Sequence, residues 1–369
     1  MGIARDIRSL TELFQTRLAR RKVAKRLALQ SSDLPRDQFD VVVHFADKSV
    51  ALYQLRSWLE SLIVLSEQVS VVVLVRQGEV ALELMEDPTF PLPVFLAVQH
   101  DEIDDFITKY NPKVSLYVNH NQRNFVMMWH PSVIHVYLGH GESDKIGISA
   151  SNQMKAYEYV YVAGDAAIDR AKRRLIMYDA DSRMIKVGRP QVDASPGHRP
   201  VPTSKARTVL YAPSWEGDRP SNGYGSVCTH GLAMISALIK SGRYRVIFRS
   251  HPLSGQRTPE YLDAVGQIAK LLDDANQADP GANHLVDTTP ALDWQLQVAD
   301  ACIADISAVT FDWLATGKPL VITQPKNPRA NVTPESVVAR LRQLPAAEAG
   351  NVVDWIDQAG SVPIHIACR

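Results

Sequence analysis

The hydrophobic pattern from residue 40 onward consists of short apolar runs separated by helical stretches. The runs are rich in valine and isoleucine and are too continuous for half-exposed strands, which indicates strands buried on both faces. Seven are expected before residue 190: Val41–Phe45, Val69–Val75, Val94–Ala97, Val114–Val118, Ile134–Leu138, Tyr159–Val162 and Ile185–Val187. The helical patterns between them cover Leu52–Glu67, Asp101–Lys109 and Ala166–Ile176. Alternation of this kind predicts a parallel sheet with helices on both faces.

A second alternating series begins after a proline-rich stretch. Gly188–Lys205 contains four prolines, which should prevent a helix or central strand, and we interpret it as an interdomain linker. The expected strands are Thr208–Ala212, Tyr244–Arg249, Ala301–Ala304 and Leu320–Thr323. The expected helices are Val227–Ser241, Tyr261–Asp274 and Phe311–Thr316, with a further helix around Val352–Asp357. The fold class predicted is therefore α/β, GT-B-like, with two doubly wound parallel-sheet domains facing a cleft.

This pattern predicts four regions in the 369-residue chain. They are a basic amphipathic helix region at 1–36, an N-terminal α/β domain at 37–193, a C-terminal α/β domain at 204–345, and a C-terminal helix and tail at 346–369. No apolar run is long enough to span a bilayer and no signal peptide is evident. The three cysteines lie far apart, so we expect a reducing, cytoplasmic environment.

Charge changes the interpretation of the first 30 residues. They hold eight basic and two acidic residues, a net +6, whereas the whole chain has a net charge of zero. Apolar residues recur there at helical spacing, from Ile3 through Leu10 to Leu18. Such a helix can lie on an anionic membrane surface, which would place the protein peripherally on the inner face of the cell membrane. It could equally dock on the body of the protein with solvated arginines. Nucleic acid is not expected as a partner, because no aromatic or glycine pattern accompanies the charge.

Polar residues follow four of the expected strands, where ligands of open α/β sheets bind. His140 has a glycine on each side and could take a proton from a hydroxyl near neutral pH, and Lys145 could meet a phosphate. Both could also be ordinary loop residues. Ser214 and Trp215 follow the first strand of the second series and could line a cleft or cap the sheet.

The next two strand ends favour an anion. Arg249 and His251 could bind a diphosphate, or Arg249 could pair with a carboxylate of its own domain. Asp305 ends a buried strand, and Ser307 and Thr310 follow at the start of a helix; they could bind phosphate or simply cap that helix. No P-loop or dinucleotide motif is present, and the D-x-D at Asp179–Asp181 lies in a charged segment that does not favour a metal-dependent GT-A enzyme.

Taken in order, the four segments resemble the CDP-glycerol glycerophosphotransferase family, the teichoic-acid primases and polymerases. His140, Gly141 and Lys145 match a motif of the form H-G-T-x-x-K. Tyr211–Trp215 is similar to Y-x-P-T-W, Arg249–Pro252 to R-x-H-P, and Ala304–Asp312 to T-D-Y-S-S-x-x-F-D. The chain departs from these patterns at Glu142, Ser143, Ser214, Ile306 and Ala308.

The resemblance implies that His140 is the catalytic base and that a CDP-polyol is the donor, with glycerol before ribitol. The residues implied to bind the donor or its phosphates are Gly141, Lys145, Ser214, Trp215, Arg249, His251, Asp305, Ser307 and Thr310. The acceptor implied is a hydroxyl on a polyanionic or lipid-linked cell-wall or capsular polymer, and CMP is released. No cofactor and no metal ion is expected. The alternatives are a GT-B glycosyltransferase that uses a nucleotide sugar and a non-catalytic module that binds nucleotide or polymer.

Overall fold

The computed structural model describes residues 38–145, 150–193, 204–289, 292–330, 332–334 and 336–360. The basic amphipathic helix region at 1–36 lies outside these residues. The chain forms two compact units. The first holds the described residues up to His140, with Gln153–Tyr161 and Asp181–Ile185; the second holds Gly141–Asn152, Val162–Ala180 and the residues from Lys186 onward.

The first sheet has seven strands in the order β3-β2-β1-β4-β5-β6-β7. They are β1 (Val41–Phe45), β2 (Val71–Val75), β3 (Val94–Leu96), β4 (Val114–Tyr117), β5 (Ile134–Tyr137), β6 (Tyr159–Val162) and β7 (Met184–Lys186). The pairings from β3 through β6 are parallel. Every residue of β1 and β2 is buried, as their unbroken valine-rich runs predict. The strand order reverses between β1 and β4, the kind of place where α/β sheets bind ligands.

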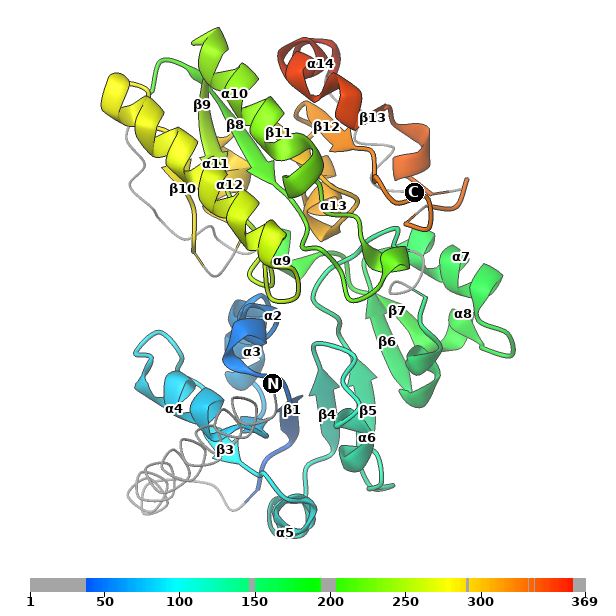
Figure 1. Cartoon of the computed structure of the whole chain (residues 1–369). Coiled ribbons are helices and arrows are strands. Elements are labelled where there is room, and N and C mark those ends of the chain that lie inside the picture. The colour runs from blue at the N-terminus through cyan, green and yellow to red at the C-terminus, as the bar shows by residue number, and fades with distance from the viewer. Residues whose placement is uncertain are drawn as a thin grey trace, which may run out of the picture. The chain divides into compact units, whose positions relative to one another are not determined.

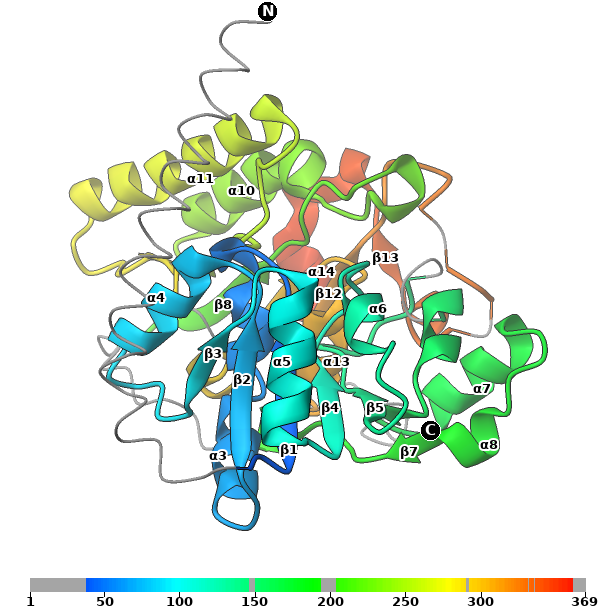
Figure 2. The same cartoon turned by 90° about the horizontal axis from the view of Figure 1, so that it is seen from below.

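Helices connect these strands. They are α2 (Leu52–Arg56), α3 (Leu59–Ser66), α4 (Gly78–Glu86), α5 (His100–Tyr110), α6 (Asn124–Met127), α7 (Asp165–Arg174) and α8 (Ala180–Arg183), with the 3₁₀ turns η1 (Ser49–Ala51) and η2 (Asn152–Ala156). In Figure 2, α5 lies over the sheet, where the ring of Phe106 is 4.9 Å from that of Phe95 on β3. The Glu102 carboxylate accepts from the backbone N–H of Gln99 at 2.8 Å and caps the start of α5.

The single helix predicted over Leu52–Glu67 is wrong at its centre, because the chain turns at Ser57 and Trp58 between α2 and α3. The Ser57 hydroxyl donates to the carbonyl of Gln54, which draws it back onto the preceding turn. The Trp58 indole N–H donates to the carbonyl of Gly139 at 2.6 Å. The tryptophan thereby fixes the backbone directly before His140.

The second sheet has six parallel strands in the order β10-β9-β8-β11-β12-β13. They are β8 (Arg207–Ala212), β9 (Tyr244–Phe248), β10 (Leu285–Val286), β11 (Ala301–Ala304), β12 (Leu320–Thr323) and β13 (Gln343–Leu344). The order again reverses at the centre, between β8 and β11. Loops after these two strands therefore meet at one edge of the sheet.

Side chains of the second sheet alternate between two cores. Val209 and Tyr211 of β8 pack in the cluster that includes α10 (Leu232–Ser241), α11 (Pro259–Ala278) and α14 (Val352–Gln358). Their neighbours Leu210 and Ala212 pack in the cluster of α12 (Trp294–Val298) and α13 (Ala308–Leu314). Figure 1 shows these helices on the two faces of the sheet. The unit is therefore doubly wound, as predicted.

Short turns complete the second unit. They are α9 (Pro190–Asp193), η3 (Pro220–Asn222), the π-helical turn η4 (Val227–Gly231), η5 (Val338–Arg340) and η6 (Ala346–Asn351). The prediction that the proline-rich stretch contains no helix is wrong for α9. Its first residue is Pro190, and the first turn of a helix needs no N–H from that position. Residues on both sides of the stretch, from Lys186 onward, group with the second unit.

Candidate active site

His140 lies three residues beyond the end of β5, the first unit's fifth strand, and directly follows Gly139. Gly139 has φ of +65°, a conformation that favours glycine. The Nδ1 of His140 lies 3.0 Å from the carbonyl oxygen of Val118, which can only accept, so Nδ1 carries the proton. In the neutral ring, Nε2 is then the basic nitrogen. The ring also meets that of Tyr53 edge to face at 5.9 Å. The arrangement fixes both the tautomer and the ring plane.

A polar cluster surrounds the same strand ends in the first unit. The Asn119 amide, two residues after the end of β4, donates to Asp47 at 2.6 Å and to Gln54 at 2.5 Å. The His120 ring stacks on Tyr137 at 4.1 Å. Burial, followed by the charge of His140, lowers the pKa of His120 to about 4. Sequence reasoning missed these residues, although Asn119 and His120 follow a predicted buried strand as directly as His140 does.

The residues after His140 pack within the second unit. The Arg170 guanidinium of α7 donates to Glu142 through Nη1 at 3.0 Å and Nη2 at 2.6 Å. The Asp144 carboxylate accepts from the backbone N–H of Val338 at 3.2 Å. Glu142 departs from the family motif, and in this chain it is paired with Arg170. This ion pair holds the loop that follows His140.

Lys145 is buried in the second unit. Its Nζ donates to the Ser214 hydroxyl at 2.8 Å and lies 5.4 Å from the centre of the Tyr224 ring. Burial lowers the pKa of Lys145 to about 8, and the negative charge of Asp305 opposes that shift. The structure thus brings together Lys145 and Ser214, which come from different motifs, and a cation held there suits a phosphate.

Asp305 is fully buried and holds three strand ends together. Its carboxylate accepts from the backbone N–H groups of Ser214 at 2.6 Å and Ser226 at 3.1 Å, and from the Thr323 hydroxyl at 2.5 Å. Burial raises the pKa of this carboxyl, and the hydrogen bonds oppose the shift. Thr310 donates its hydroxyl to the carbonyl oxygen of Asp305 at 2.6 Å. Both residues therefore position the loops after β8 and β11.

Ser307 differs from these two residues. It precedes α13, is 7% exposed, and makes no side-chain cap bond. Its hydroxyl has no hydrogen-bond partner among the described residues. A buried polar group of this kind needs an explanation, and a bound ligand oxygen would supply one.

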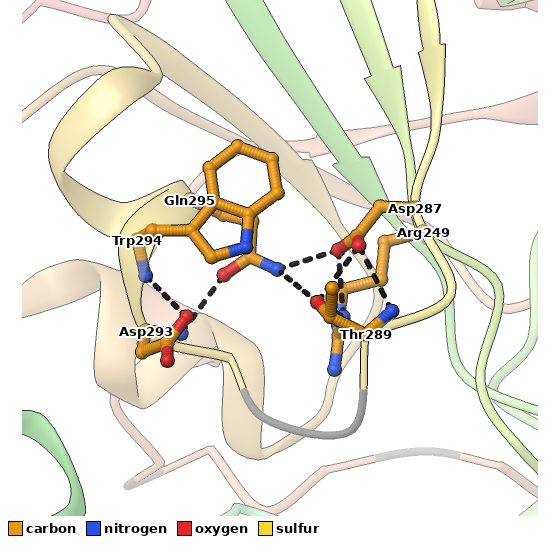
Figure 3. Close-up of polar contacts among 6 residues, drawn as sticks. All are labelled: Arg249, Asp287, Thr289, Asp293, Trp294 and Gln295. Atoms are coloured by element: carbon orange, nitrogen blue, oxygen red, sulfur yellow. Dashed lines mark hydrogen bonds and ion pairs between the residues drawn. The ribbon is translucent and has the colours of Figure 1, made fainter. Parts of the chain in front are cut away.

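Arg249 belongs to a network at the ends of β9 and β10 (Figure 3). Its Nη1 donates to Asp287 at 2.6 Å and to the Thr289 hydroxyl at 3.1 Å. The buried Gln295 amide of α12 donates to Asp287 at 2.5 Å and to Thr289 at 3.1 Å. The pairing of Arg249 with a carboxylate of its own unit, one of the two alternatives from sequence, is present. It holds the guanidinium in a fixed position at the strand end.

His251 and Trp215 stack within the second unit. Their ring centres are 6.3 Å apart with 24° between planes, and the Arg257 guanidinium lies 5.9 Å from the centre of the Trp215 ring. The backbone N–H of Leu253 donates to Nδ1 of His251 at 3.1 Å, so Nε2 carries the proton in the neutral ring and can donate. The neighbouring Glu216 accepts from the backbone N–H groups of Gly255 and Arg257 and ties this loop to the end of β8.

Within the part of the chain that the structure describes, no group of three or more histidine, cysteine, aspartate or glutamate side chains is arranged to hold a metal ion. None of the helices described has the length and apolar character needed to cross a membrane.

The two parallel sheets, with polar residues gathered at their strand ends, define an α/β protein with the GT-B fold. The family model described as CDP-glycerol:poly(glycerophosphate) glycerophosphotransferase matches residues 103–329, more than half of the chain. The chain belongs to this family of glycerophosphotransferase-type transferases. A search of curated protein sequences finds no significant match.

Solved structures share the fold at low identity. The wall teichoic acid polymerase TagF is 13% identical, with 97% of this chain and 91% of that chain covered and a TM-score of 0.51. A putative UDP-N-acetylglucosamine 2-epimerase from Listeria monocytogenes is 13% identical, with 88% and 92% covered and a TM-score of 0.54. The UDP-GlcNAc 2-epimerase from Neisseria meningitidis, bound to UDP-GlcNAc, is 12% identical, with 89% and 96% covered and a TM-score of 0.54.

Proposed function

We propose that this protein transfers a polyol phosphate, glycerol phosphate as first choice, from a CDP-polyol to a hydroxyl of a cell-wall or capsular polymer or its lipid-linked precursor. The observation that carries the proposal is the family match, whose span contains His140 and all nine residues assigned to the donor. The tautomer of His140 supports it, because the Val118 carbonyl leaves Nε2 as the basic nitrogen.

In the proposed reaction, Nε2 of His140 removes the proton from the acceptor hydroxyl. That oxygen forms a bond to the polyol-bearing β-phosphorus, the bond from this phosphorus to the oxygen bridging to CMP breaks, and CMP leaves with the electron pair. Lys145, His251 and Ser307 donate to the diphosphate and offset the charge on the leaving group. No metal ion or other cofactor enters this scheme.

The other assigned residues support these groups. Asp305 and Thr310 hold the loops that carry Ser214 and Ser307. Arg249 is held beside the same sheet edge by Asp287, where its guanidinium contributes positive charge. Trp215 stacks on His251 and fixes its plane. The acceptor would be polyanionic or lipid-linked, and the protein would work peripherally at the inner face of the cell membrane.

The test is nucleotide release from CDP-glycerol, CDP-ribitol, UDP-glucose and UDP-N-acetylglucosamine, each with a short polyol-phosphate or lipid-linked acceptor. We expect CMP from one CDP-polyol and a loss of about 10²- to 10⁴-fold in rate for His140→Ala. The matched control is His100→Ala, at an exposed histidine of α5, which should keep its rate.

Three results would contradict the proposal. UDP release would make the protein a sugar transferase with the same fold. Donor binding without turnover would make it a binding module. Near-normal CMP release from a folded His140→Ala variant would remove the base from the mechanism.

A further inference from the structure

Arg189 is an arginine that the sequence motifs leave unassigned. It follows Gly188, whose φ is +71°, and directly precedes α9 in the second unit. Its Nη2 is hydrogen-bonded to Asp312 of α13, with side-chain exposures of 19% and 12%. Burial raises the pKa of the Asp312 carboxyl, and the neighbouring guanidinium opposes that shift. One role open to Arg189 is that of counterion to this carboxylate alone.

The hydrogen bonds of Arg189 argue against that. Arginine–carboxylate pairs are frequently bidentate, with two parallel N–H donors. Here only Nη2 bonds to Asp312, and Nε is buried with no hydrogen-bond partner among the described residues. A buried donor left unpaired destabilises a protein by about 1–3 kcal/mol, and more when it is charged. The unused N–H therefore needs an acceptor that the described residues do not supply.

A second unpaired donor belongs to the same region. The hydroxyl of Ser307, also buried and without a partner among the described residues, lies one residue before Ala308. Asp312 is on the same short helix, α13, as Ala308. Arg189 and Ser307 thus both lie beside this helix. Each has a side-chain polar atom without a hydrogen-bond partner among the described residues.

The backbone of the histidine loop also reaches this point. A Cβ placed on Gly141 would lie 2.5 Å from the Cβ of Ala308 and 3.9 Å from Nη1 of Arg189. Because Gly141 and Ala308 are both small, the histidine loop, the start of α13 and the Arg189 guanidinium can lie close together. Gly141 and Ser307 are both residues that the proposed function assigns to the donor phosphates.

We propose that Arg189 binds phosphate oxygens of a nucleoside diphosphate, together with the hydroxyl of Ser307, and that Asp312 positions its guanidinium. The ligand class follows from the chemistry: a planar cation and a hydroxyl donor, both partly desolvated, match phosphate oxygens. This inference rests on the proposed function for the identity of the donor, since the phosphates would be those of the CDP-polyol.

The test uses the full chain with three variants: Arg189→Gln, Asp312→Asn and the double variant. Binding of inorganic pyrophosphate and of CDP-glycerol is measured by calorimetry, and stability by urea unfolding. We expect Arg189→Gln to weaken binding of both ligands by about 10- to 100-fold, the range for hydrogen bonds to charged groups. Asp312→Asn should bind within about threefold of the parent, because the guanidinium remains.

The double variant decides between the two roles. In Arg189→Gln the charge of Asp312 is left unpaired, and the double variant removes that charge. The unfolding free energy of the double variant should therefore be higher than that of Arg189→Gln. Its binding of both ligands should stay as weak as that of Arg189→Gln. Recovery of parental binding would show that Arg189 acts only as a counterion and would overturn the proposal, as would a parent that binds neither ligand. The matched control is Arg245→Gln, at a buried arginine near the amino end of β9 that donates to Thr208 of β8. This variant should leave binding unchanged, whatever its effect on stability.

Pyrophosphate also separates this inference from the proposed function. Binding of pyrophosphate through Arg189 without turnover of any CDP-polyol would contradict the function and leave the anion site. Turnover of CDP-glycerol with unchanged binding in Arg189→Gln would leave the function and remove the anion site.

Discussion

Lys145 shows how a single buried charge makes stability depend on pH. Its pKa is about 8 when folded, against 10.5 for an exposed lysine, because burial disfavours the ammonium. Below pH 8 both states hold the proton and the folded state bears the full desolvation penalty. Between pH 8 and 10.5 the unfolded chain holds more protons, so this group's contribution to stability rises with pH.

We therefore predict that the unfolding free energy of the parent, relative to Lys145→Met, rises by up to about 3 kcal/mol between pH 8 and 10.5. Urea unfolding of both proteins at several pH values measures this difference. Subtracting the variant removes the contributions of other titrating groups. A difference that is constant across the window would show that the lysine is not desolvated.

At the residue scale, the sequence predicts which side chains lie at strand ends but not what they contact. The family resemblance implies that Asp305 and Arg249 both bind the donor. The partners of Asp305 include Ser214 and Thr323, and those of Arg249 include Asp287. These partners are distant in sequence, so no local pattern could reveal them. The signal that was available and missed is Arg189, an arginine directly after a strand and a glycine.

At the element scale, buried strands were the most predictable features. Val41–Phe45 and Ala301–Ala304 have the predicted bounds, because runs of apolar residues between turns have few other interpretations. Short edge strands such as β10 and β13, of two residues each, carry too little pattern to be predicted. The π-helical turn η4, at the start of the helix expected from Val227, could not be predicted because helical periodicity does not distinguish a wide turn from an α-helix.

The ion pair between Glu142 and α7 gives a prediction at this scale. Arg170 and Glu142 are 10% and 14% exposed, so removing the arginine leaves a mostly buried carboxylate unpaired. Arg170→Met should lower the unfolding free energy by about 1–3 kcal/mol, less than a fully buried pair would lose. Urea unfolding measures it.

Two variants control for this prediction. Glu142→Gln combined with Arg170→Met should recover part of the loss, because the charge of Glu142 is removed. The recovery should stay incomplete, because Asp144, whose carboxylate lies 3.7 Å from Nη1 of Arg170, still loses its cation. Lys270→Met breaks the exposed pair with Asp274 and should change stability by less than about 0.5 kcal/mol. An equal loss in both single variants would show that the buried pair contributes no more than a surface pair.

At the scale of the whole molecule, the two sheets were predictable and the membership of the loops was not. His140 groups with the first unit and Gly141 with the second. A repeated strand–helix pattern gives only the order of elements along the chain. The simplest expectation from it is therefore that each domain is one continuous stretch of residues. Membership of a compact unit depends on contacts such as Lys145 with Ser214 and Glu142 with Arg170, which join segments far apart in sequence.

The charge distribution of the whole chain yields the last prediction. The first 30 residues carry +6 and the remainder −6, so we expect any long-range attraction of the chain to an anionic surface to come from that segment. Each basic residue near an anionic bilayer contributes about 1 kcal/mol. Deletion of residues 1–30 should therefore weaken binding to phosphatidylglycerol vesicles by at least about tenfold in a sedimentation assay.

Substitutions within the segment separate charge from apolar insertion. Replacing Arg20, Arg21 and Lys22 by glutamine should weaken binding mainly at low salt, because screening already reduces the attraction at high salt. Replacing Leu10 and Phe14 by glutamine should weaken it at every salt concentration, because the apolar face is then lost. Binding to neutral phosphatidylcholine vesicles should be weak for all forms. If the deletion binds anionic vesicles as the parent does, the basic segment is not the membrane contact.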